Sequence, residues 1–179
     1  MTLRTKILIS IFLVALGASC RLLPHFWNFA PVTAIALFSG AYLGKRWGIA
    51  VPFSAMLIGD FFIGFYELPL MIVVYACFAL FGLGGSFLGK SKNAKTVLTA
   101  SLVSSVTFFL ATNWAVWQFS PWYLKNFSGL MECYLAALPF YRNTLLGDIF
   151  YTVVLFGAYE AVKIWVNKEK LSFAFQVKK

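Results

Sequence analysis

Six long hydrophobic segments occupy most of this 179-residue chain. They lie at about residues 7–23, 29–43, 47–66, 68–88, 96–118 and 144–166. A transmembrane helix needs about 20 predominantly apolar residues, and a soluble chain of this length cannot bury so many. Hydrophobic residues make up 61% of the chain and charged residues 12%, against roughly a half and a quarter in soluble domains. We therefore expect an all-α, polytopic membrane protein with six transmembrane helices, in which residues 1–179 form a single transmembrane domain.

Lysine and arginine are concentrated on one side of the expected spans. Only Arg21, Lys125 and Arg142 fall on the other side, out of 15 basic residues. Because Lys and Arg in short loops mark the cytoplasmic side, we expect both termini in the cytoplasm and the chain in the bacterial cytoplasmic (inner) membrane. The net charge of +9 then follows from topology and does not indicate a nucleic-acid partner.

The amino-terminal segment and the cysteines leave two alternatives open. Arg4 and Lys6 before an apolar run that ends in Gly17-Ala18-Ser19 resemble a cleavable signal peptide, although we favour a retained span. Cys20, Cys77 and Cys133 form no CxxC pair, so we expect no structural zinc site and no cofactor. Cys20 and Cys133 both fall near the outer side, which leaves a disulfide between them as an alternative.

Polar and ionisable residues gather in the outer half of the expected spans. A charge inside a bilayer costs a few kcal/mol or more, so such residues usually mark a pocket or pathway. We predict a ligand pocket open to the outside. Its candidate ligand-binding residues are Arg21, His25, Asn28, Asp60, Asn113, Trp117, Arg142, Asn143, Asp148 and Tyr151. The alternative is that Asp60 or Asp148 pairs with Arg142 or Arg21 to hold the helices together, because buried charges must be paired.

The longest expected loop, about residues 119–142, contains prolines, a glycine and the apolar stretch Leu130–Leu138. We expect this stretch to form a short separate helix. It would be either a lid over the pocket or an ordinary interfacial helix. Glu67 and Glu132 are interpreted as ordinary loop charges.

Catalytic motifs are weak in this sequence. Gly84–Ser91 matches the P-loop pattern, but that motif needs a preceding strand, and here a membrane helix precedes it, so we interpret the match as fortuitous. His25 is the only histidine, and no nucleophile motif is present. We therefore expect binding rather than catalysis. The alternatives are a membrane-embedded enzyme using Asp60, Asp148 and Arg142, or a structural membrane protein without a ligand.

Several stretches resemble known membrane proteins. Residues Pro31–Ala50, followed by Ile58-Gly59-Asp60, resemble the second and third spans of the S components, the substrate-binding subunits of energy-coupling factor vitamin transporters. Pro31–Gly44, Ala111–Trp117 and Pro139–Thr152 also resemble an uncharacterised family of small bacterial membrane proteins allied to that superfamily. The resemblance covers most of the chain.

The resemblance implies an S-component-like helical bundle that takes up a small vitamin-like compound from outside. The protein would deliver it by tilting in the membrane, either alone or with an energy-coupling transmembrane subunit and two ATPases. In that class small residues of the first span dock the partner, and Ala15 and Ser19 are the matching positions. Cobalamin is one candidate ligand, for which Cys77 and His25 would be the cobalt ligands on softness grounds. The alternative for Cys77 is a buried small apolar residue.

Overall fold

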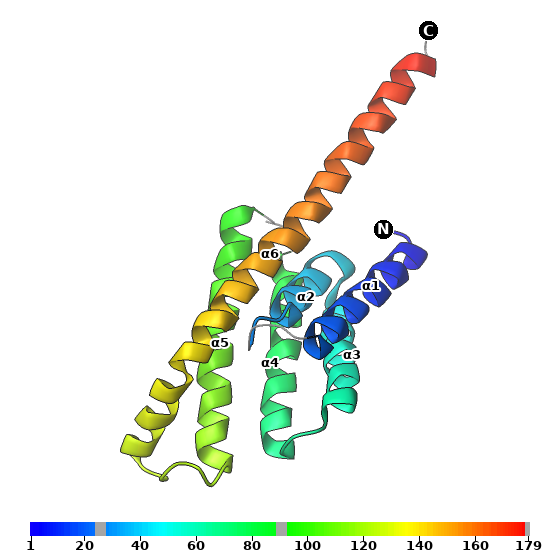
Figure 1. The fold of residues 1–179 in the computed structure, drawn as a ribbon. Coiled ribbons are helices and arrows are strands. Elements are labelled where there is room, and N and C mark those ends of the chain that lie inside the picture. Colours follow the sequence, from blue (N-terminus) through cyan, green and yellow to red (C-terminus); the bar gives the residue numbers. More distant parts are fainter. Residues whose placement is uncertain (24–27, 89–92, 178–179) are drawn as a thin grey trace.

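Helices form all the regular structure of the described residues (Figure 1). The structure is a computed structural model that describes residues 1–23, 28–88 and 93–177, with side chains up to residue 168. The elements are α1 (Leu3–Leu22), α2 (Val32–Phe38), the π-helix η1 (Ser39–Leu43), α3 (Lys45–Ile63), α4 (Leu68–Phe87), α5 (Ala94–Phe119) and α6 (Phe127–Val177). These ranges contain no strand, so the all-α class predicted from the sequence is confirmed.

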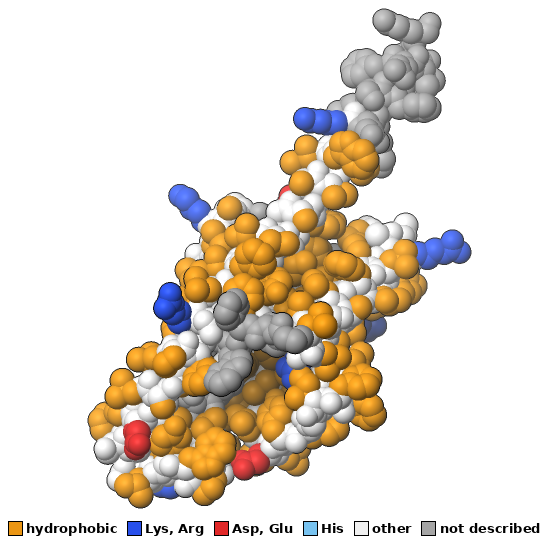
Figure 2. Space-filling view, in the orientation of Figure 1, with side chains coloured by type: hydrophobic (Ala, Val, Ile, Leu, Met, Phe, Trp, Pro, Cys, Tyr) orange, Lys and Arg blue, Asp and Glu red, His pale blue; other side chains and the backbone are white. Residues whose placement is uncertain are grey.

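Five helices of the described chain, α1, α3, α4, α5 and α6, are long and apolar enough to cross a membrane. Hydrophobic side chains cover most of the face seen in Figure 2. Over the whole described surface, large hydrophobic side chains such as Phe61, Phe87 and Trp122 are exposed. Such a surface is unfavourable in water and stable against lipid tails. The prediction of a helical membrane protein is supported. The second expected span is shorter than the others, because it consists of seven residues of α2 and five of η1.

The short α2–η1 segment lies at the centre of the bundle. Every residue of α2 is buried, and the segment packs against α3, α4, α5 and α6. Ile35, Leu37 and Phe38 belong to the main hydrophobic cluster. Pro31 precedes the first turn, and Gly44, with a φ of 104°, ends the segment. A segment too short to span the bilayer is tolerated at this depth because protein, rather than lipid, surrounds it.

Glycines bring the backbones of η1, α3 and α4 into direct contact. A Cβ on Gly82 would overlap the carbonyl oxygen of Gly48, and a Cβ on Gly40 would overlap that of Gly82. A Cβ on Gly85 would overlap the carbonyl oxygen of Leu37. Helix packing therefore explains Gly85, which stands at a variable position of the P-loop pattern. The match begins in the last turn of α4 rather than after a strand, and residues 89–91 of it lie outside the described part of the chain.

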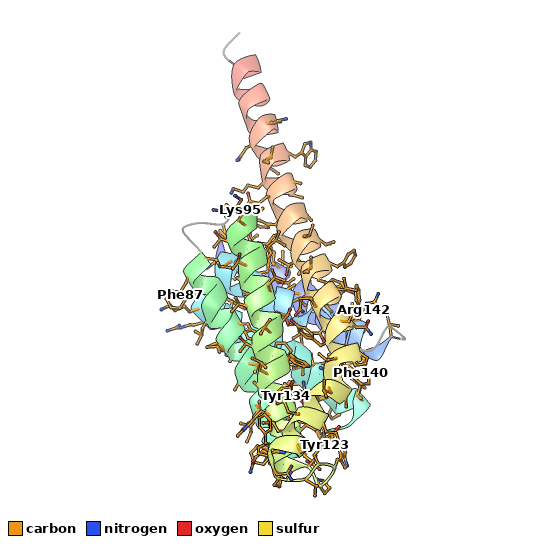
Figure 3. The ribbon with its side chains drawn as sticks, turned by 90° about the vertical axis from the view of Figure 1, so that its left-hand side faces the viewer. Phe87, Lys95, Tyr123, Tyr134, Phe140 and Arg142 are labelled. Atoms are coloured by element: carbon orange, nitrogen blue, oxygen red, sulfur yellow. The ribbon has the colours of Figure 1, made fainter. Side chains whose placement is uncertain are left out.

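The helix ends divide between two ends of the bundle. The start of α1 and the start of α5 lie at the upper end in Figure 1, and the turns after α3 and α5 lie at the lower end. Figure 3 shows the same division, with Phe87 and Lys95 at one end and Tyr123 at the other. The upper end carries the chain segments that the basic residues assign to the cytoplasm. The orientation relative to a membrane stays a prediction.

The expected long loop before the last span is mostly helical. α6 runs without interruption from Phe127 and contains Pro139, so the short separate helix predicted for this region is wrong. The hydroxyl of Tyr134 donates to the Leu110 carbonyl at 2.8 Å and holds this first part of α6 against α5. The hydroxyl of Thr144 donates to the Phe140 carbonyl at 3.2 Å just after the proline. Packing of this kind against a neighbouring helix lets membrane helices continue through proline.

Candidate functional site

Arg21 and Asp60 form an ion pair between α1 and α3. One terminal nitrogen of Arg21 contacts Oδ1 of Asp60, and the other donates to the sulfur of Met56 at 2.8 Å. The hydroxyl of Tyr75, on α4, donates to Oδ2 of Asp60 at 2.7 Å. Gly59 leaves room for this arrangement, because a Cβ there would overlap Nε of Arg21. Both oxygens of the buried carboxylate therefore have a partner, and Arg21 satisfies its charge.

Asp148 lies on α6 in a separate polar cluster and is only 2% exposed. The hydroxyl of Ser105, on α5, donates to its Oδ2 at 2.5 Å, and the hydroxyl of Thr33, on α2, also hydrogen-bonds its carboxylate. Beside them the hydroxyl of Thr152 donates to Oγ of Ser101 at 3.1 Å. Within the described residues no Lys or Arg forms an ion pair with Asp148. The partners of this carboxylate in the described part of the chain are therefore hydroxyl groups.

A cavity of about 220 Å³ lies where the two clusters approach each other. Its wall consists of Arg21, Asn28, Ala30, Val32, Thr33, Met56, Tyr66, Val74, Phe78, Phe108, Thr144 and Asp148. A smaller cavity of about 140 Å³ shares Asn28, Phe108 and Thr144 with it, so the two adjoin. The result is a small apolar chamber into which an arginine, an aspartate and an amide converge.

Five of the ten predicted ligand-binding residues come together here. Arg21, Asn28 and Asp148 line the larger cavity, and Asn28 and Asn113 line the smaller one. Asp60 lies directly behind Arg21 and lines neither. Among the alternatives for charge pairing, the structure pairs Asp60 with Arg21. His25 lies outside the described residues.

The other four predicted residues do not line these cavities. Arg142 is exposed on α6, where Figure 3 labels it, and Asn143 beside it is half-buried. Trp117 donates from Nε1 to the Leu124 carbonyl at 2.9 Å, in the turn between α5 and α6. Tyr151 packs its ring 5.4 Å from that of Phe29. Their role in binding stays a prediction without support from this geometry.

The sequence that forms this site matches a known protein family. Residues 1–171 match the family described as Family of unknown function (DUF6580). The chain belongs to the DUF6580 family. No curated protein and no solved structure matches it. The DUF6580 match includes both polar clusters and the cavity between them, so the site lies within the part that defines the family.

Several residues of the DUF6580 site escaped the sequence analysis. They are Thr33, Tyr66, Tyr75, Ser101, Ser105 and Thr152. A signal was present for some of them. Ser101 and Ser105 are four residues apart and share a helix face, as do Asp148 and Thr152. Tyr75 has no such pattern, because it lies alone in an apolar stretch.

The cysteines of the DUF6580 chain are free. Cys20 approaches the hydroxyl of Tyr151 at 3.9 Å, whereas Cys133 donates to the Asn113 carbonyl at 3.4 Å, so the disulfide between Cys20 and Cys133 does not form. Cys77 belongs to the hydrophobic core and lines neither cavity. The described residues contain no group of three His, Cys, Asp or Glu side chains that could hold a metal.

The predicted docking residues of the DUF6580 chain lie on its surface. Ala15 and Ser19 line an open groove of about 550 Å³ between α1 and α3. Ala50 and Ser54 of α3 form part of the opposite wall. Small side chains from two helices therefore leave room for a further helix to approach closely.

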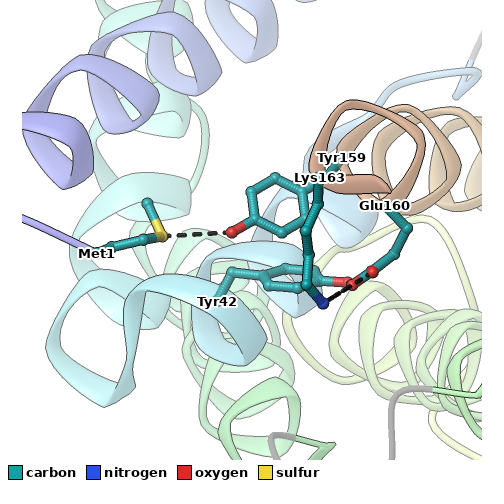
Figure 4. Close-up of polar contacts among 5 residues, drawn as sticks. All are labelled: Met1, Tyr42, Tyr159, Glu160 and Lys163. Carbon is teal, nitrogen blue, oxygen red and sulfur yellow. Dashed lines mark hydrogen bonds and ion pairs between the residues drawn. The ribbon is translucent and has the colours of Figure 1, made fainter. Parts of the chain in front are cut away.

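A cluster at the opposite end of the bundle joins α6 to η1 (Figure 4). The hydroxyl of Tyr42 donates to Oε1 of Glu160 at 2.8 Å, and Lys163 pairs with Oε2 of Glu160 at 3.0 Å. The rings of Tyr42 and Tyr159 lie 4.2 Å apart, and the Tyr159 hydroxyl contacts the sulfur of Met1 at 3.5 Å. This cluster joins α6 to η1 at the end assigned to the cytoplasm, beside a cavity of about 280 Å³ that Tyr42 and Glu160 line.

Proposed function

We propose that this protein binds a small vitamin-like compound in the cavity between Arg21 and Asp148 and takes it up across the membrane, as S components do. The observation that carries the proposal is the buried carboxylate of Asp148 on the wall of a cavity. A purely structural tie would pair Asp148 with Arg21, but Arg21 pairs with Asp60. Charged groups inside a membrane are costly, and a cavity where such groups converge is the default binding site.

The size of the cavity limits the compound. Its volume of about 220 Å³, with about 140 Å³ adjoining, is at the lower end of the roughly 300–1,000 Å³ usual for ligand pockets. This favours a compact compound and argues against cobalamin, which is far larger. The position of Cys77 in the core adds to this argument, since the proposed cobalt ligand does not reach the cavity.

After binding, the protein would carry the compound across the membrane. With both termini in the cytoplasm of a bacterial inner membrane, the cavity would receive its compound from the outer side. The groove beside Ala15 and Ser19 offers a docking place for an energy-coupling transmembrane subunit. The protein would work either with such a subunit and its ATPases or alone.

A membrane-embedded enzyme built on Asp60, Asp148 and Arg142 finds less support. Arg142 is exposed and Asp60 lies behind Arg21, so neither shares the cavity wall with Asp148. A general acid and base would have to approach one substrate together.

The proposal is tested by purifying the protein from membranes in mild detergent and identifying bound small molecules by mass spectrometry. We expect a compound that remains with the wild type and with Glu132→Gln but is lost from Asp148→Asn. Glu132 is exposed on the same helix, so its variant removes the same charge outside the cavity. Cells that produce the wild type should also accumulate that compound faster than cells that produce Asp148→Asn. If no compound is bound and neither variant changes uptake, the proposal is wrong.

A further inference from the structure

The charges around the cavity do not balance. Arg21 and Asp60 cancel each other as an ion pair, while Asp148 adds a second carboxylate. The titratable side chains that face Asp148 across the cavity are Arg21 and Tyr66, and Tyr75 lies behind them on Asp60. From α2 and α5, which pack against α6, the groups that reach Asp148 are the hydroxyls of Thr33 and Ser105. Among the residues that the structure describes, one carboxylate at the cavity therefore has no cationic partner.

The hydroxyl donors leave this carboxylate able to bind a cation. Thr33 and Ser105 satisfy part of its hydrogen-bonding capacity without neutralising it. Because Asp148 lines an open cavity, a bound molecule can approach it. An anionic ligand would be repelled by Asp148 and would find Arg21 already paired with Asp60.

Aromatic side chains complete the wall. Tyr66, Phe78 and Phe108 line the cavity, and the ring centroids of Phe78 and Phe108 lie 5.2 Å apart. Aromatic faces carry partial negative charge and attract cations, including alkylated and heterocyclic nitrogen. The same faces offer apolar contact to the rest of an organic molecule.

From this balance of charge we infer that the compound held in the cavity is a small organic cation, with its charged nitrogen beside Asp148 and its apolar part against Phe78 and Phe108. The inference rests on the proposed function, because it names the chemical class of the compound that the same cavity takes up. It adds that selectivity is set by charge, and that anionic or neutral analogues of equal size are excluded.

Three probes of nearly equal size and shape test the inference. Benzylamine is a cation at neutral pH, benzyl alcohol is neutral and benzoate is an anion. We expect benzylamine to raise the Tm of the purified full chain by a few degrees in a saturable way, while the other two leave it unchanged. Asp148→Asn should weaken the apparent affinity for benzylamine by about 30-fold or more, because it removes one partner of a buried charge pair. Glu132→Gln should not change it.

A second variant keeps the test decisive if Asp148→Asn does not fold. Phe108→Leu retains the carboxylate and an apolar wall but removes one aromatic face. It should weaken benzylamine binding about two- to fivefold. The inference is wrong if benzoate or benzyl alcohol raises the Tm as much as benzylamine, or if both cavity variants bind benzylamine like the wild type.

Two further outcomes separate this inference from the proposed function. If none of the probes changes the Tm and Asp148→Asn alters only the pH dependence of unfolding, a proton balances the carboxylate and the inference is wrong. If an anionic or neutral compound co-purifies and is taken up, the proposed function stands and the inference fails. A co-purified cation that is lost from Asp148→Asn supports both.

Discussion

The Arg21–Asp60 ion pair joins α1 to α3, so changing it tests a structural role of these two residues. Asp60→Leu leaves the Arg21 charge without its partner inside the bundle, and breaking a buried pair in this way costs about 3–5 kcal/mol. Replacing both residues, Arg21→Met with Asp60→Leu, is expected to restore most of the lost stability, because apolar residues can substitute for a buried pair. Thermal unfolding of the purified single and double variants in one detergent measures both effects.

The neighbouring hydroxyl provides the control for this pair. Tyr75→Phe removes one hydrogen bond to Asp60 and keeps the ring, so we expect a loss of about 1.5–3 kcal/mol at most. An Asp60→Leu variant as stable as the wild type would mean that Arg21 does not depend on this partner. A double variant that is stable but no longer binds the compound would show that Arg21 serves the ligand as well as the fold.

The sequence predicts the buried carboxylates but not their partners. Asp60 and Asp148 could be predicted as site residues, because a carboxylate inside an apolar segment needs a reason. The partner of Asp60 could not be predicted, since Arg21 and Arg142 are equally near the outer side in the sequence. Rotation of each helix about its own axis decides the pairing. It directs Arg21 to α3 and leaves Arg142 exposed.

The glycine contacts between η1, α3 and α4 predict that a larger side chain there destabilises the helix packing. Gly82→Ala would force a Cβ into the backbone of Gly48, where no flexible side chain can move away. Overpacking typically costs about 1–3 kcal/mol, and here we expect at least the upper end or a chain that does not fold. Gly84→Ala is the matched control on the same helix, because its Cβ would meet open space.

Both glycine variants are measured by yield of monodisperse protein and by Tm. The control should equal or slightly exceed the wild type, since alanine favours a helix over glycine. Equal Tm values for the two variants would contradict the close approach of α3 and α4.

The hydrogen bond from Tyr42 to Glu160 joins η1 to the part of α6 around residue 160. Tyr42→Phe removes the donor and keeps the ring contact with Tyr159, so we expect a loss of about 1 kcal/mol confined to this end. Hydrogen exchange should become faster in η1 and around residues 156–163 and stay unchanged around the turn between α5 and α6. Faster exchange throughout the chain would show that this contact stabilises the whole bundle instead.

Elements were predicted from the sequence to different degrees. The first, third, fourth and fifth segments coincide with α1, α3, α4 and α5 to within a few residues, because long apolar runs are a strong signal. The second was placed correctly but extends over fewer helical residues than expected, between Pro31 and Gly44. The prediction is wrong around Pro139, which was expected to lie in a loop. Proline ends helices in water, whereas neighbouring helices support it here, so the expected loop is part of α6.

The distribution of side chains over the whole molecule links its fold to its function. The cavity lies near the end of α1 and the start of α2, while the Tyr42–Glu160 cluster joins η1 to α6 at the other end. A carrier needs a binding site that is reached from one side of the membrane at a time. Which side faces the outside therefore decides whether the protein can take a compound up.

Labelling of single cysteines tests this orientation. In a chain whose three native cysteines are replaced by serine, Lys95→Cys marks the end assigned to the cytoplasm and Leu124→Cys, at a position 72% exposed in the wild type, marks the other. We expect a membrane-impermeant maleimide to label Leu124→Cys on intact spheroplasts and Lys95→Cys only after permeabilisation. Labelling of both in denatured protein, and of neither in the cysteine-free chain, provides the controls. The reverse pattern would place the cavity on the cytoplasmic side, and a compound bound at Asp148 would then come from inside the cell, which is incompatible with uptake.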